Sequence, residues 1–417
     1  MQVRGWHAAA AAGAVVVLVG GAMAGAAQLR NSGSSADVAS RSGSVAPAQF
    51  KVPGARGAAS VSAPTTPAPT VTATVPPKPS VPSERRTLRV TKRLVGPFSP
   101  KSVVATGNGL VIAANMMYRH TITVFSSKGS VVTTIPDAVD LRSFGHRSAP
   151  SGKVKGAPVE TAISPDGKHA WVSNYAMYGK GFSPEGKDNC PGRNSLSRSF
   201  VYRVDLATKK IDGVVEVGKT PKYLATTPDG RRLLVANWCS YDLSIVDVAS
   251  MRQVSSVHLG PHPRGIAVTK DSSTAYVAVM GAAGIAKVNL KTLGVSWIRG
   301  VGAAPRHVVL SPDESRLYAS VNGTGQVVAV NTATKRVLHR VRTGQQPRSL
   351  AISPDGTALY VVNYASGTMS KVRAKDMKVI QTVKTAVHPI GITYDSTTDS
   401  VWVSCYRGVV YVMADRA

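Results

Sequence analysis

The stretch Pro347–His388 decides the fold and reads PRSLAISPDGTALYVVNYASGTMSKVRAKDMKVIQTVKTAVH. Four runs in it, PRSLAIS, ALYVVN, TMSKVRA and KVIQTVKT, predict four short β-strands, because they are rich in β-branched, apolar or aromatic residues and are separated by turn residues. The PDG between the first two runs predicts a tight turn, since Pro presets φ and Gly accepts positive φ. A sheet of four such strands cannot bury both faces alone, so copies of it must stack on one another.

The copies are present, and each begins at a proline. Five opening prolines follow one another at intervals of 42 residues: Pro221, Pro263, Pro305, Pro347 and Pro389. Two looser copies open at Pro100 and Pro158. The copy at Pro100 carries an extra segment of 16 residues, and the copy at Pro158 carries an extra segment of 21 residues. A period of about 40 residues with four strands per unit is typical of a β-propeller. The sequence therefore predicts an all-β fold, a seven-bladed β-propeller.

The two ends of this region predict how the ring closes. The last unit, Pro389–Ala417, contains only three strands, and the segment Arg86–Gly96 (RTLRVTKRLVG) reads like the missing fourth. We expect this N-terminal strand to complete the last blade, which would remove two exposed sheet edges.

The recurring phrase SPDG, followed about ten residues later by a strand ending in VVN or VAN, resembles the YVTN family of β-propeller repeats. The resemblance covers roughly residues 86–417 and implies the fold. Propellers of this general type include surface proteins, a DNA-binding member, lactonases and subunits of redox enzymes, so the resemblance leaves the activity open.

The N-terminal region predicts an extracytoplasmic location. Residues 1–30 include the uncharged stretch Ala8–Ala27, which as a helix would be about 30 Å long and could cross a bilayer. Either a cleaved signal peptide or an uncleaved membrane anchor fits this stretch. Residues 31–84 are rich in Ala, Ser, Pro and Thr and predict a disordered linker, which leaves residues 85–417 for the propeller.

The three cysteines fall at or near the end of a second strand or in the loop that follows it. Cys190 lies in the insertion of the second unit, and Cys239 lies in the neighbouring third unit, so these two can form a disulfide. Three unpaired thiols are the alternative, and the state of Cys405 is left open.

The charge of the chain points to an anionic partner. The formal net charge is +28, and six basic and two acidic residues precede residue 85, so +24 belongs to residues 85–417. Such a charge favours a wall polymer, an acidic polysaccharide, nucleic acid or anionic headgroups as partner.

A candidate ligand site follows from positions within the repeat. The residue after the opening proline is basic in five units, and we expect these side chains to ring the channel mouth, with histidines and aromatic residues of the loops between second and third strands beside them. The basic residues are Lys101, Lys222, Arg264, Arg306 and Arg348; the histidines are His262, His307 and His388; the aromatic residues are Tyr175, Trp238, Tyr364 and Tyr406. A basic ring with stackable rings suits phosphate or carboxylate groups next to bases or sugars. The alternative is that this pattern belongs to the repeat itself, with the basic stems packing between blades.

The two insertions add basic residues that we expect on the same rim, in residues 138–157 and 176–197. Long loops gathered on one face of a rigid scaffold commonly carry binding sites.

The sequence favours a membrane-tethered, monomeric binding module without a cofactor. One alternative is a metal-dependent lactonase-type hydrolase, for which Glu160, Asn174 and Asn237 are the weak candidate ligands; the other is a structural surface protein. No serine-hydrolase or zinc-hydrolase motif stands out, and the recurring aspartates of the PDG-type turns read as turn formers.

Overall fold

A computed structural model describes residues 81–117, 119–179, 188–190 and 196–417. The predicted N-terminal helix and residues 31–80 of the predicted linker lie outside the described residues. Within the described part, no helix is long and apolar enough to cross a membrane.

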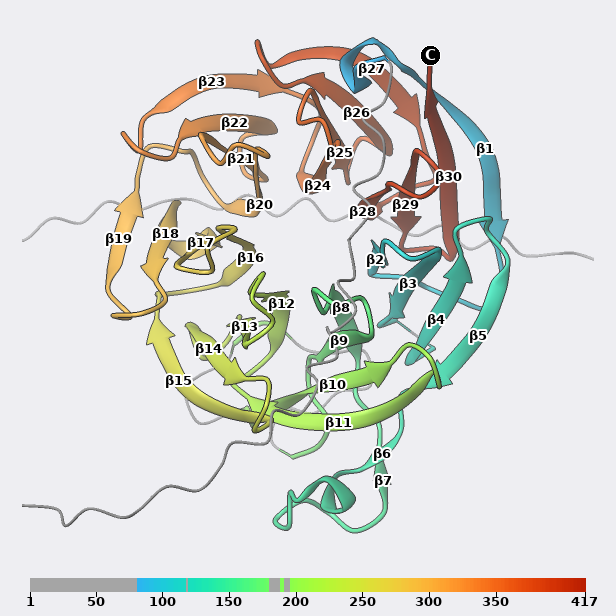
Figure 1. Cartoon of the computed structure of the whole chain (residues 1–417), viewed down its shortest axis with the longest axis vertical. Coiled ribbons are helices and arrows are strands. Elements are labelled where there is room, and N and C mark those ends of the chain that lie inside the picture. Colours follow the sequence, from blue (N-terminus) through green and yellow to red (C-terminus); the bar gives the residue numbers. More distant parts are fainter. Residues whose placement is uncertain (1–80, 118, 180–187, 191–195) are drawn as a thin grey trace, which may run out of the picture. The chain divides into compact units, whose positions relative to one another are not determined.

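Seven four-stranded antiparallel sheets form a ring of blades, as the period predicted (Figure 1). In each blade the strand that follows the opening proline is innermost and the last strand lies on the perimeter. Blade 1 contains β2 (Ser102–Ala105), β3 (Leu110–Asn115), β4 (Thr121–Ser126) and β5 (Val131–Pro136). Blade 2 contains β8 (Pro158–Ile163), β9 (His169–Asn174), β10 (Ser199–Asp205) and β11 (Lys210–Val217). Blade 3 contains β12 (Pro221–Thr226), β13 (Arg232–Asn237), β14 (Asp242–Asp247) and β15 (Arg252–His258).

The other blades follow the same plan. Blade 4 contains β16 (Pro263–Val268), β17 (Thr274–Val279), β18 (Gly284–Asn289) and β19 (Val295–Ile298), with a 3₁₀ turn, η3 (Met280–Ala282), after β17. Blade 5 contains β20 (Pro305–Leu310), β21 (Arg316–Val321), β22 (Gln326–Asn331) and β23 (Val337–Arg342). Blade 6 contains β24 (Pro347–Ile352), β25 (Ala358–Asn363), β26 (Thr368–Arg373) and β27 (Lys378–Lys384). Blade 7 contains β28 (Pro389–Asp395), β29 (Ser400–Cys405), β30 (Val409–Arg416) and, from the other end of the sequence, β1 (Thr87–Val95).

The hydrophobic core lies between blades. The second strand of each blade is buried almost throughout, while the perimeter strands alternate or are exposed. Trp171, Tyr318, Tyr360 and Trp402 are the bulky residues of the second strands and pack between neighbouring sheets. Stacking of this kind buries the faces that one sheet would leave in water, which is why the repeat must close into a ring.

The predicted closure is present. β1 pairs antiparallel with β30 from Thr87 opposite Arg416 to Val95 opposite Val409. A short 3₁₀ turn, η1 (Ser83–Arg85), precedes β1 and contacts blade 6, where the Ser83 amide donates to Asp355 Oδ2 at 2.7 Å.

A buried ion pair lies beside this closure. Lys371 Nζ of β26 is 2.5 Å from Asp415 Oδ1 of β30, and both side chains are fully buried. The Tyr360 hydroxyl donates to the other carboxylate oxygen of Asp415 at 2.5 Å, and Lys371 also donates to the Arg86 carbonyl at 2.8 Å. Blades 6 and 7 are therefore joined by a polar cluster as well as by apolar packing.

The first insertion lies against the outside of the ring, a position that the sequence did not indicate. It forms the hairpin β6 (Val139–Asp140) and β7 (Lys153–Val154) around η2 (Leu141–Phe144), outside the ring next to β11 (Figure 1). His146 stacks edge-on against Phe200 and contacts the Val214 carbonyl at 3.2 Å. Its apolar residues, Leu141 among them, join the core between blades 1 and 2 and so determine its direction.

The recurring aspartates form turns, as predicted. Asp166, for example, accepts from the Ser164 hydroxyl at 2.5 Å and from the Lys168 amide at 3.0 Å. Asp229, Asp271, Asp313 and Asp355 make the corresponding bonds in their own blades.

Candidate functional site in the central channel

A repeated irregularity turns the residue after each opening proline toward the channel. In six blades the pairing of the first and second strands shifts register directly after this proline. In five blades the residue before the proline has positive φ although it is not glycine: Thr220, His262, Ala304, Gln346 and His388. Bulges re-aim side chains, and such left-handed residues persist only where the surroundings impose them. The repeat therefore fixes the direction of the basic side chains.

The basic residues lie inside the channel and not on its rim. The exposed fractions are 2% for Lys101, 3% for Lys222, 4% for Arg264 and 9% for Arg306, while Arg348 is half-buried. The sequence predicted a broken ring of these residues about the mouth, and four of the five are buried. Packing between neighbouring blades does not account for all of them either, because Arg264 of blade 4 reaches Glu160 of blade 2.

Two carboxylates reach these cations. Glu160 of blade 2 lies 3.3 Å from Lys101 Nζ of blade 1 and 3.7 Å from an Arg264 nitrogen of blade 4. Because blade 3 lies between blades 2 and 4, this contact joins two blades that are not neighbours. Asp188 lies 2.6 Å from Lys222 Nζ. The Arg306 guanidinium has no ion-pair partner within the described parts of the chain.

Five cations thus face two carboxylates in a buried space, and the pKa values respond to this imbalance. Burial lowers the pKa of Lys101 well below its usual value, and the nearby arginines lower it further. Burial and the nearby Arg264 also lower the pKa of Lys222 well below its usual value. Burial, together with Arg264 and Arg348, also lowers the pKa of Arg306. The basic groups therefore disfavour one another's charged forms, and an anion next to them would oppose these shifts.

His307 forms part of the channel wall in its neutral form. Burial lowers its pKa to about 3, and Arg264 and Arg306 reinforce this effect. Its Nδ1 accepts from the Leu350 amide at 3.0 Å, so the proton resides on Nε2, which lies 2.7 Å from the Tyr223 hydroxyl of blade 3. His307 was expected among the rim histidines, and neither the repeat nor the composition pointed to its contact with Tyr223.

The aromatic residues hold the cations in place. Lys222 Nζ lies 3.6 Å from the ring centre of Trp238, and the Arg348 guanidinium lies 3.4 Å from that of Tyr364. In each case the cation follows the opening proline and the aromatic residue follows the second strand of the same blade. The amides of Trp238 and Tyr364 donate to Thr220 and Gln346, the residues before those prolines, which fixes the two loops together.

The two rings have little free face for a ligand. His262 stacks on Trp238 with ring centres 4.3 Å apart, and His388 stacks on Tyr364 with ring centres 4.5 Å apart. Each ring therefore already contacts a cation and an imidazole. Tyr175 is buried, and Tyr406 contacts Tyr364 edge-on with ring centres 6.0 Å apart. The expectation that these residues offer stacking platforms for bases or sugars has no support in this geometry.

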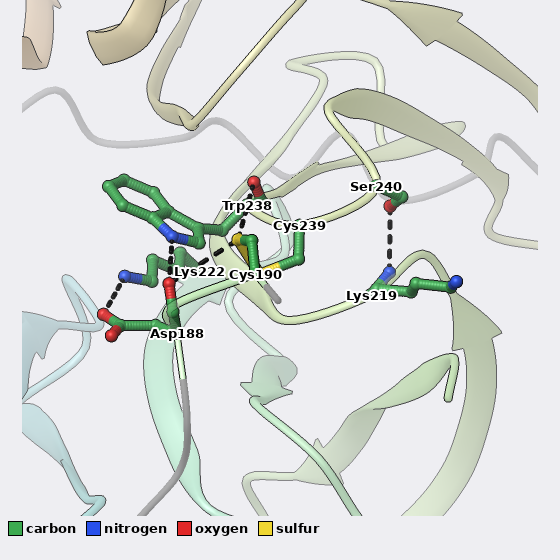
Figure 2. Close-up of a disulfide and its surroundings, with 7 residues drawn as sticks. All are labelled: Asp188, Cys190, Lys219, Lys222, Trp238, Cys239 and Ser240. Atoms are coloured by element: carbon green, nitrogen blue, oxygen red, sulfur yellow. Dashed lines mark hydrogen bonds and ion pairs between the residues drawn. A yellow bond between two sulfur atoms is a disulfide. The ribbon is translucent and has the colours of Figure 1, made fainter. Parts of the chain in front are cut away.

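A disulfide fixes part of the second insertion to the mouth (Figure 2). Cys190 and Cys239 are bonded, with Cα atoms 5.2 Å apart, which is the pairing expected from the sequence. The Trp238 indole donates a hydrogen bond to the Asp188 carbonyl at 2.8 Å, and the Asp188 carboxylate accepts from Lys222 Nζ at 2.6 Å (Figure 2). No local pattern indicated the role of Asp188, because its position depends on this disulfide.

Alkylation in the absence of reductant is expected to leave Cys190 and Cys239 unmodified, because both sulfur atoms are bonded. Cys405 is fully buried, and burial raises the pKa of its thiol to about 12, so it should react only after unfolding. Mass mapping of native and denatured protein treated with iodoacetamide measures both expectations. Modification of Cys190 in the native protein would contradict the disulfide.

The three candidate metal ligands, Glu160, Asn174 and Asn237, do not form an evident site for a metal cation. Glu160 is already engaged by Lys101 and Arg264, and the surrounding positive charge opposes a divalent ion. The Asn237 amide donates to Asp242 and Ser244 in its own loop. Asn174 is fully buried, and neither of its amide atoms has a hydrogen-bond partner in the described ranges.

Among the described residues, one group of three could offer ligand atoms to a metal: His169, Asp205 and Asp212. The sequence did not predict this group, and it lies at the end of blade 2 remote from the opening proline. Arg203 and His169 already contact the Asp212 carboxylate, at 2.9 and 3.7 Å, and Asp205 accepts from Thr208. These contacts are sufficient to explain why the group is together.

Comparison with known proteins agrees with the fold. Residues 274–397 match the model of the family described as "Lactonase, 7-bladed beta-propeller". A solved structure titled Kuenenia stuttgartiensis Hydrazine Synthase is similar with a TM-score of 0.59 and 15% identity, over 76% of this chain and 96% of that one. No curated protein sequence matches the chain.

The chain is thus a seven-bladed β-propeller, as its resemblance to the YVTN repeats implied, and its residues 274–397 are similar to the family of lactonase propellers. The likeness to the solved structure concerns the fold alone.

Proposed function

We propose that this protein is an extracytoplasmic binding module, held at a membrane by its N-terminal segment, that binds an anionic ligand in the channel mouth. One observation carries the proposal: five basic side chains lie in or at the channel, four of them buried, and the described residues place two carboxylates against them. Burying cations without partners is costly, so sites of this kind are rarely retained for stability. An anion between them would remove that cost. The uncharged stretch Ala8–Ala27 supports the location.

Replacing two of these arginines is expected to abolish binding. With Arg264→Met and Arg306→Met, affinity for a heparin oligosaccharide should fall about 100-fold, since each charge-assisted contact contributes about 1.5–3 kcal/mol. The melting temperature should stay the same or rise, because the change removes two mutually repelling buried charges and leaves Glu160 paired with Lys101. Fluorescence anisotropy and thermal unfolding measure the two effects.

The matched control is Arg252→Met with Arg336→Met. Both arginines are exposed and lie at the turns between third and fourth strands, on the opposite rim from the mouth. This pair removes the same charge and the same residue type. Equal losses in both variants would mean that the net charge acts as a diffuse field and that the channel is not the site.

A metal-dependent lactonase-type hydrolase is the second candidate, favoured by the family match over residues 274–397. A stoichiometric divalent ion in the purified protein, together with metal-dependent hydrolysis of a lactone, would favour it. A structural surface protein would show neither property and would not bind anions through Arg264 and Arg306.

A further inference from the structure

The position and chemistry of the cations restrict the ligand more narrowly than the proposed function does, and the inference rests on that function. We infer that the ligand presents a compact phosphate-type dianion, which enters the channel end-on and lies among Lys101, Arg264 and Arg306.

Depth is the first argument. These three side chains are between 2% and 9% exposed. The contacts of Arg264 with Glu160, at 3.7 Å, and of His307 with Tyr223, at 2.7 Å, join blades that are not neighbours, so the surrounding groups are close together. A polymer that lies across the rim cannot touch such groups. A small anion, or the charged end of a longer molecule, can reach them.

Charge is the second argument. Among the described residues, five basic groups lie near two carboxylates. With all five protonated, a carboxylate monoanion would leave most of this excess in place, while a dianion would leave about one charge. Two buried donors, Arg264 Nη1 and Arg348 Nε, have no hydrogen-bond partner in the described parts of the chain. A guanidinium matches the oxygen spacing of a phosphate and can donate two parallel bonds to it.

The aromatic rings supply the third argument. Trp238 and Tyr364 each contact a cation and a histidine ring, so recognition by stacking on a base or a sugar has no free platform there. What the site offers is charge and hydrogen-bond donors, which a phosphate group satisfies by itself. Free phosphate and a terminal phosphate monoester share this chemistry.

Asp188 occupies the edge of the same site. Its carboxylate is half-exposed and pairs with the buried Lys222, where the disulfide Cys190–Cys239 and the Trp238 indole hold the loop. A bound anion and Asp188 therefore repel each other and compete for the same cations. Loss of the Asp188 charge should tighten anion binding, which is an effect that misfolding cannot produce.

The test uses isothermal titration calorimetry on the full chain with three probes at equal ionic strength: inorganic phosphate, methyl phosphate and acetate. Phosphate or methyl phosphate, or both, should bind, and acetate should bind at least about tenfold more weakly. Arg264→Met with Arg306→Met should lower phosphate affinity about 100-fold. Asp188→Asn should raise it about threefold, and Arg252→Met with Arg336→Met should leave it unchanged.

The outcomes separate the two proposals. Equal binding of phosphate and methyl phosphate supports free phosphate as the ligand, and tighter binding of the ester supports a terminal phosphate. If a heparin oligosaccharide requires Arg264 and Arg306 but neither phosphate probe binds, the proposed function stands and this inference is overturned. If no anion depends on the two arginines, both are overturned. An unchanged or lower phosphate affinity in Asp188→Asn would contradict an anion bound close enough to Asp188 to be repelled by it.

Discussion

A chain that begins at Gly96, without residues 1–95, is expected to form no soluble monomeric propeller. The missing strand β1 pairs with β30 along its whole length, and Leu88 of β1 is part of the core between blades 6 and 7. Without β1, the backbone groups of β30 that face it are unpaired at an open sheet edge, which is a template for aggregation. Size-exclusion chromatography and circular dichroism should show aggregates or an unfolded chain.

The control for this deletion begins at Val81 and keeps every residue of η1 and β1. It should elute as a monomer and melt as the full chain does. A second control adds a synthetic peptide of residues 81–96 to the shortened chain, which should recover soluble propeller if the missing strand is the sole defect. A shortened chain that melts at the unchanged temperature would refute the closure by β1.

Asp415→Asn is expected to reduce the free energy of unfolding by about 3–5 kcal/mol, because it leaves Lys371 charged and buried without a counter-ion. The change is nearly isosteric, so the loss reports on charge and not on packing. Denaturant unfolding monitored by tryptophan fluorescence measures it.

The matched variant removes the whole cluster at once, with Lys371→Met, Asp415→Leu and Tyr360→Phe. An apolar replacement of a complete buried ion pair is commonly neutral or stabilising, so the triple variant should recover most of the stability that Asp415→Asn loses. If the triple variant is as unstable as the single one, the ion pair is not the source of the effect, and packing at the closure is.

Much of the fold could be predicted, because the same pattern of strands and turns recurs in each repeat. The 42-residue interval and the aspartate turns recur in register, and the three-stranded last unit pointed to a strand before Phe98. A local pattern that is repeated in this way constrains the strands, the turns and the closure together. The sequence did not predict where the first insertion packs. That position depends on apolar contacts of Leu141 with blades 1 and 2, which leave no signal in the local sequence.

The candidate site could be predicted only as a set of residue types. The position of Arg264 after a proline was visible, but its depth in the channel depends on the bulge at that proline and on Glu160 two blades away. The sequence also suggested that Trp238 was open to a ligand. Its contact with Lys222 depends on the bulge within blade 3, and its stacking with His262 arises only when blade 4 packs beside blade 3.

The closure also determines how the propeller bears mechanical load. Tension applied through the chain before Val81 would not reach β1 first, because Ser83 and Glu84 are bonded to the Asp355 and Thr357 side chains of blade 6 and the Arg86 carbonyl accepts from Lys371. The pull is therefore divided between two blades before it acts on the β1–β30 ladder. A propeller that is tethered through its N-terminal side while it binds a ligand would therefore resist extension at the β1–β30 closure.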